Sequence, residues 1–270
     1  MSTSVTPLLL AAEGEGGFHV PSISEFFPAA ILFGGTPFEF NRLHLIRILA
    51  TIALLTIFVL AARRAKVVPG RFQAAIELVL GFVRKNIVEE VMGVERGRRY
   101  LPMITTIFVT ILAFNLTGVI PGLNLAGTSV AGVAILLALW VFVAYWAAGI
   151  RKHGFFGYLR NTMFPPGIPA PIYVILAPIE LLQILIIRPA SLVIRLTANM
   201  VAGHIMLVLC FAATHFLLLE AGPELKVLSA LTLAGGLAIT LFEVFVAGLQ
   251  AYIFAILASA YINMSLEEEH

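Results

Sequence analysis

Hydrophobic residues occur along most of this chain in long, nearly uninterrupted runs, rather than in the short alternating patterns of a soluble fold. About 20 consecutive apolar residues are enough for a helix to cross the hydrocarbon core of a bilayer, which is roughly 30 Å thick. Three runs have about that length, and the two nearest the carboxyl end are much longer. We therefore predict an all-α integral membrane protein with five membrane-crossing helices, at residues 43–62, 101–121, 130–150, 172–219 and 227–264.

The two longest runs exceed what a perpendicular crossing requires. A helix of about 36 residues is about 54 Å long, well beyond the hydrocarbon thickness. Tilting relieves such a mismatch, and Pro178 and Pro189 can add bends. We expect these two helices to form a long, steeply tilted hairpin.

A different pattern occupies residues 71–95, where apolar and charged positions alternate at helical spacing. This pattern is typical of an amphipathic helix that lies on the membrane surface. Nine lysines and arginines fall between Arg63 and Arg99, and such basic segments belong on the cytoplasmic side. Five spans then place the acidic segment 1–42 outside and the tail 265–270 in the cytoplasm, on either side of a single membrane domain, 43–270.

Composition agrees with a membrane location. The chain is 60% hydrophobic and only 12% charged, whereas soluble domains carry about 25% charged residues. The net charge of +2 gives no reason to expect a nucleic-acid partner. The single cysteine, Cys210, excludes an internal disulfide and a thiolate metal cluster, and we expect it only to pack. We predict neither a metal nor a cofactor.

Several polar side chains interrupt the last two apolar runs. An ionisable group at hydrocarbon depth costs at least about 2.5–3.5 kcal/mol, so each is a functional hypothesis by default. At about 100° per residue, Arg188, Arg195 and Asn199 share one stripe of the first long helix, and His204 faces the opposite side. In the last helix, two further polar residues share a face, namely Glu243 and Gln250.

The polar groups on different sides of the helix also differ in their chemistry. Arg195 cannot lose its proton and so attracts or blocks charge, whereas His204 and Glu243 can relay protons. No acid in the chain is an obvious partner for Arg195 on its own face, which points to a partner on another polypeptide. Small residues run beside these groups and would let another subunit's helices approach closely; they are Ala198, Ala202, Gly203, Ala247, Gly248 and Ala251.

Structural explanations compete with functional ones at several positions. Arg188 can be an interfacial residue that snorkels from a tilted helix, and Glu180 can be its structural partner two turns away. Asn115 is typical of an interhelical hydrogen bond, Gln250 alone of a polar contact between helices, and His204 alone of a satisfied interior histidine.

The segments RPASLVIRLTANMVAGHIM, FEVFVAGLQAYIFAILASAYI, LEEEH and FNLTGVIPG together resemble subunit a of the F-type ATP synthase membrane sector, of bacterial type. The resemblance is strongest over about 170–270. It implies a non-catalytic stator subunit that supplies two offset proton half-channels to a rotating c-ring, so that proton flow drives rotation and ATP synthesis. The implied partners are the c-ring, b-type peripheral-stalk subunits and the lipid bilayer. The implied location is a bacterial plasma membrane, with the mitochondrial inner membrane as the alternative.

The resemblance also implies roles for individual residues. Arg195 matches the family's essential arginine, which faces the ring carboxylates, and Asn199 and Gln250 match polar residues near it. His204 and Glu243 match a linked pair in the outward half-channel, with the acid and the histidine exchanged relative to some bacterial members. The residues of the cytoplasmic half-channel are not assigned.

Two other classes of function remain as alternatives. A self-contained transporter with Arg195 on an anionic substrate would require related halves with broken helices at the midplane, and no repeat is visible. An intramembrane hydrolase would need Ser191 and His204 together, but thirteen residues of helix separate them by about 20 Å.

Overall fold

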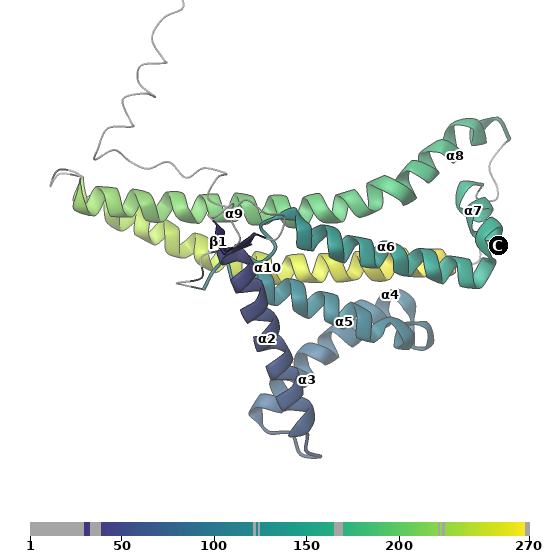
Figure 1. Ribbon diagram of the computed structural model, residues 1–270, viewed down its shortest axis with the longest axis horizontal. Helices are drawn as coiled ribbons and strands as arrows, with labels where there is room; N and C mark the ends of the chain where they lie inside the picture. Colours follow the sequence, from purple (N-terminus) through teal and green to yellow (C-terminus); the bar gives the residue numbers. More distant parts are fainter. Residues whose placement is uncertain are drawn as a thin grey trace, which may run out of the picture.

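The computed structural model describes residues 30–32, 39–120, 123, 125–164, 170–220, 222 and 225–267. This part of the chain is almost entirely helical (Figure 1). Its elements are β1 Ala30–Leu32, β2 Phe40–Asn41, α2 Arg42–Arg63, α3 Arg71–Val83, η3 Arg84–Glu89, α4 Glu90–Met92, α5 Val94–Leu116, α6 Ala131–His153, α7 Phe155–Met163, η4 Ala170–Ile172, α8 Tyr173–Leu182, η5 Gln183–Ile187, α9 Arg188–Leu219 and α10 Lys226–Leu266. Here η3 and η5 are π-helical and η4 is a 3₁₀ turn.

Five helical stretches within these residues are long and apolar enough to cross a membrane. They are α2, α5, α6, α10 and the continuous stretch Tyr173–Leu219, which joins α8, η5 and α9. This confirms the predicted all-α membrane fold with five spans. The tilt of the last two helices against a membrane stays a prediction.

Several boundaries differ from those predicted. The helix expected at 101–121 begins at Val94 and ends at Leu116. Its start was predicted too late because its first turns are charged, and a search for apolar runs does not detect them. The short helix α7 and the antiparallel pair β1–β2 were not predicted. The proline-rich stretch 165–169 and most of segment 1–42 lie outside the described residues.

The predicted amphipathic helix 71–95 is divided into α3, η3 and α4 and ends at Met92. Gly93 follows with a φ of +74°, a backbone conformation that favours glycine, and the chain reverses there into α5. Across the π-helical turn, Nε of Arg84 donates to Oε1 of Glu89 at 2.6 Å. Val83, Ile87 and Val88 are buried against the bundle. Its position on a membrane surface stays a prediction.

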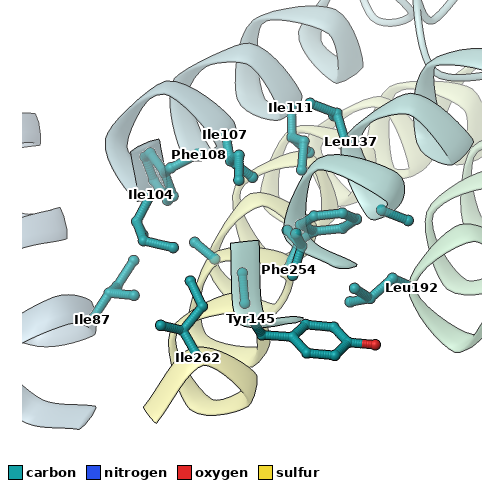
Figure 2. Close-up of a cluster of buried hydrophobic side chains, with 14 of the residues drawn as sticks. Ile87, Ile104, Ile107, Phe108, Ile111, Leu137, Tyr145, Leu192, Phe254 and Ile262 are labelled. Atoms are coloured by element: carbon teal, nitrogen blue, oxygen red, sulfur yellow. The ribbon is translucent and has the colours of Figure 1, made fainter. Parts of the chain in front are cut away.

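The core lies where α5, α6, α9 and α10 pack together. Figure 2 shows Ile104, Ile107 and Ile111 close to Phe254 and Ile262, among other buried apolar side chains. Lipid tails are as apolar as these residues, so close packing rather than exclusion of water holds such helices together.

Helix α2 stands apart from this core and leans away from it (Figure 1). Only Leu43 and Ile46, near its start, are buried, and they pack with Leu125. At the same end Nε of Arg47 donates to the carbonyl of Gly127 at 2.8 Å, and Arg42 donates to the carbonyl of Leu123 at 3.0 Å. Along the rest of α2 no side chain is fully buried, although the helix still contacts α3 and α5.

Candidate functional site

The candidate site lies along the antiparallel hairpin of α9 and α10 (Figure 1). Near the closed end, the hydroxyl of Thr214 donates to that of Thr232 at 2.9 Å. Farther along, Gly203 lies against Glu243. Both contacts fit one register, in which each step forward on α9 matches one step back on α10. The same register places Gln250 at the level of Leu196, one residue after Arg195.

Glu243 is buried, with 6% of its surface exposed, and its carboxyl group lies directly against the backbone of Gly203. A β-carbon placed on Gly203 would collide with the carboxyl carbon and both carboxyl oxygens of Glu243. Any larger residue at position 203 would therefore displace the acid.

His204 is half-buried and lines the same small cavity as Glu243. This cavity has a volume of about 10 Å³, close to the smallest space that holds one water molecule. Asn115 lines it from α5. The structure thus brings together His204 and Glu243, which the sequence placed on different helices, and adds Asn115 to them.

Asn115 is almost fully buried, and its Oδ1 accepts a hydrogen bond from the hydroxyl of Thr128 at 2.5 Å. The expected bond between membrane helices is instead a bond to the segment that precedes α6. The amide Nδ2 of Asn115 makes no hydrogen bond within the described residues. This leaves one buried donor on a residue of the cavity wall, where a carboxylate or a water molecule would satisfy it.

Arg195 lies on the exposed side of α9, away from this cavity. In the described part of the chain its side chain makes no hydrogen bond or ion pair. Asn199, one turn later, is half-buried, and its amide nitrogen has no hydrogen-bond partner among the described residues. Gln250 is buried on α10. The cation and the titratable pair therefore occupy different sides of α9.

Only some of the small residues singled out in the sequence lie on a surface that another subunit could approach. Ala198 and Ala202 are exposed on the side of Arg195, as expected for a surface that another helix approaches. The same expectation is wrong for Gly203, Ala247 and Ala251, which are buried between the protein's own helices. Spacing alone does not tell an internal helix contact from an external one. Gly248 is half-buried.

Arg188 is buried with 7% of its surface exposed, so it does not snorkel. Its guanidinium carbon lies 5.4 Å from the ring centroid of Tyr261, a cation–π contact between α9 and α10. No ion pair joins it to Glu180 in the described part of the chain, so the predicted pairing is wrong. The π-helical turn η5 lies between the two residues and shifts the register that the spacing assumed.

Two tyrosines accompany this contact. The hydroxyl of Tyr145 donates to the carbonyl of Ile184 at 2.5 Å, within η5, and its ring lies edge-on to that of Tyr261. Tyr158, on α7, packs its ring directly over Gly149. Burial raises the pKa of the Tyr158 hydroxyl to about 12, although the nearby positive charge of Arg188 acts to lower it. Neither tyrosine was assigned a role at this site from the sequence, because their position near Arg188 depends on how α6, α7 and α9 pack together.

The described residues include no group of three or more His, Cys, Asp or Glu side chains arranged to hold a metal ion. Cys210 is half-buried beside Gly236, where a β-carbon on the glycine would lie 3.4 Å from that of the cysteine. This is an ordinary packing contact. The site is therefore built from one exposed cation, one buried titratable cluster and amides between them.

Comparison with known proteins gives a single family. The sequence profile described as ATP synthase A chain matches residues 44–263. A protein of Rhodococcus erythropolis named ATP synthase subunit a is 42% identical over 94% of this chain and 92% of its own length. Proteins of the same name from Pseudarthrobacter chlorophenolicus and Hyphomonas neptunium are 35% and 37% identical, over 97% and 87% of this chain and 98% and 90% of their own lengths. These matches confirm the resemblance noted in the sequence.

Proposed function

Because this chain belongs to the ATP synthase A chain family, we propose that its Arg195 faces the carboxylates of a rotating c-ring and separates two offset proton half-channels. The chain is the proton-translocating stator subunit of a bacterial F-type ATP synthase, and it works in the membrane as part of a complex.

The observation that carries the proposal is the exposure of Arg195 within a helix long and apolar enough to span the membrane. A guanidinium facing hydrocarbon without a partner is strongly unfavourable. A carboxylate on a neighbouring subunit would remove that penalty with a charge-assisted hydrogen bond. The exposed Ala198 and Ala202 leave room for such a neighbour to approach closely.

The outward half-channel begins, in this proposal, at the cavity formed by His204, Glu243 and Asn115. His204 and Glu243 exchange protons with water from outside, and the free amide donor of Asn115 orients a water molecule or the carboxylate. From His204 to Arg195 is nine residues, about 14 Å along the helix. Asn199 and Gln250 lie in that interval and complete the path towards the ring.

A ring carboxylate that receives this proton becomes neutral and can turn into lipid, whereas the charged form would face a large desolvation penalty. After nearly a full turn it releases its proton through the second half-channel. Arg195 stabilises the ionised carboxylate between the two paths. Because the guanidinium keeps its proton at biological pH, it blocks direct transfer instead of relaying it.

Contacts between helix ends support an orientation of the chain in the membrane. Nζ of Lys152, at the end of α6, donates to the carbonyl of Leu266, at the end of α10. The start of α2 meets the segment before α6 at the opposite end of that helix. The positive-inside rule then supports a cytoplasmic C-terminus and an N-terminus outside. We assign no catalytic residue, and b-type stalk subunits complete the proposed complex.

Disulfide cross-linking in the assembled synthase tests the proposed partner. In a Cys210→Ser background, Ala198→Cys and Ala202→Cys should each form a disulfide with a cysteine placed beside the ring carboxylate. Ile52→Cys, also at an exposed position but on α2, is the control and should form none. Absence of the product at both alanine positions in an assembled complex, or equal yield at Ile52, would overturn the proposal.

A further inference from the structure

A large cavity lies away from the proposed proton path, in the angle between α2, α3 and α5. It has a volume of about 840 Å³. Its walls come from Leu54 and Phe58 on α2, Leu80 and Gly81 on α3, and Thr105 and Val109 on α5. We call this space the α2–α5 groove. Figure 1 shows α2 and α5 diverging with α3 between their far parts.

The walls of the groove are mostly apolar, and two of the threonines that line it have their hydroxyl protons already bonded. Thr51 and Thr106 donate their hydroxyl protons to carbonyls one turn back in their own helices. Those hydroxyl protons are therefore not available to an occupant. The groove is suited to hydrocarbon.

One end of the groove meets a second, more polar cavity of about 370 Å³, and Arg84 and Leu101 line both. Arg98 and Glu89 also line the second cavity. Arg84 uses Nε to bind Glu89, and its terminal nitrogens make no hydrogen bond within the described residues. A guanidinium has five N–H donors, so Arg84 keeps donors for an anion. Glu77 also lines the groove, where it accepts from Gln73 and would repel a phosphate. An anionic group therefore belongs at the Arg84–Arg98 end.

We propose that the α2–α5 groove binds an anionic phospholipid, with its acyl chains between α2, α3 and α5 and its phosphate at Arg84 and Arg98. Residues 63–99 hold nine basic and four acidic side chains, so this end of the groove carries excess positive charge. Basic pockets between membrane helices on the cytoplasmic side are known to favour anionic lipid headgroups.

The groove is too small to enclose a membrane-spanning helix of another subunit. An α-helix with its side chains is about 11 Å wide, so about 840 Å³ holds only roughly six residues of one. A flexible acyl chain has no such fixed width. The bound lipid would fill the angle beneath α2 and support a helix whose buried side chains, Leu43 and Ile46, both lie near its start.

A phosphatidylglycerol with a photoreactive group in its acyl chain tests this in the intact, detergent-purified synthase. We expect cross-links on groove peptides of α2, α3 and α5, and unlabelled phosphatidylglycerol should compete better than phosphatidylcholine. Arg84→Gln should lower the labelling about fivefold, because a basic side chain near a lipid surface contributes about 1 kcal/mol. Lys85→Gln removes the neighbouring charge, which lines neither cavity, and should change the labelling little.

Three further variants separate the site from its surroundings. Gly81→Leu adds a side chain to the wall of the groove, at a position where a β-carbon meets nothing within 4 Å, and it should abolish the labelling. Gly132→Leu, equally open on α6, should not. Glu89→Gln breaks the ion pair but keeps Arg84, and should preserve or increase labelling. Labelling that is indifferent to Arg84→Gln and Gly81→Leu, equal competition by phosphatidylcholine, or cross-links from the groove to another subunit's helix in place of lipid would overturn the proposal.

Discussion

The carboxyl group of Glu243 lies directly against the backbone of Gly203, the residue that precedes His204. The turn of α9 that contains Gly203 and His204 therefore has two structural roles. It leaves the space that the acid of α10 occupies, and it places the imidazole on the wall of the same cavity. A glycine at this position explains how two bulky titratable side chains fit between closely packed helices.

Gly203→Ala should impair proton translocation. The new methyl group would collide with the Glu243 carboxyl group, which lies at the end of a flexible side chain, so the acid would move from its place in the cavity. We expect an assembled synthase with reduced ATP-driven acidification of proteoliposomes. Gly132→Ala, where the added methyl group meets nothing within 4 Å, is the matched control. Wild-type pumping by Gly203→Ala would show that the position of Glu243 is unimportant.

Exchange of the two titratable residues tests whether they act as a pair. His204→Gln or Glu243→Gln alone should slow pumping by about a hundredfold, the lower end of what a positioned acid or base contributes to proton transfer. Because both side chains line one cavity, the double variant His204→Glu, Glu243→His keeps one acid and one imidazole there. It should pump faster than the single variants His204→Glu and Glu243→His. A double variant as slow as the worse single one would contradict a shared role.

The contact between Arg188 and Tyr261 should stabilise the hairpin of α9 and α10. A desolvated cation–π contact contributes about 2 kcal/mol. Tyr261→Leu should therefore lower the thermal stability of the purified complex, while Tyr261→Phe, which keeps the ring, should change it little. Arg188→Lys keeps the charge and should fall between wild type and Arg188→Leu. Equal losses in the phenylalanine and leucine variants would assign the effect to the hydroxyl instead.

The sequence predicted the membrane fold well, because long apolar runs directly reflect the thickness of the bilayer. Helix ends were less predictable. Val94 begins a helix whose first turns are charged, and the reversal at Gly93 depends on a backbone angle that no hydropathy pattern reports. The π-helical turn η5 was equally hidden, and it broke the pairing of Glu180 with Arg188 that ideal helical spacing suggested.

For the candidate site, angular arithmetic correctly separated Arg195 from His204, because both lie on one regular helix. It did not reveal which small residues are internal, since Gly203 and Ala247 face helices whose position depends on the tertiary packing. The bond of Asn115 to Thr128 was also unpredictable, because thirteen residues and a loop separate them. The c-ring contact of Arg195 remains a prediction.

Passive proton leak through the membrane sector, measured in liposomes together with ATP-driven acidification, is the most direct test of Arg195 as the barrier between the half-channels. Arg195→Ala should assemble, fail to pump and let protons leak faster than wild type. Arg160→Ala, which removes an exposed arginine from α7, should match wild type in both measurements. Normal pumping with unchanged leak in Arg195→Ala would contradict the barrier role.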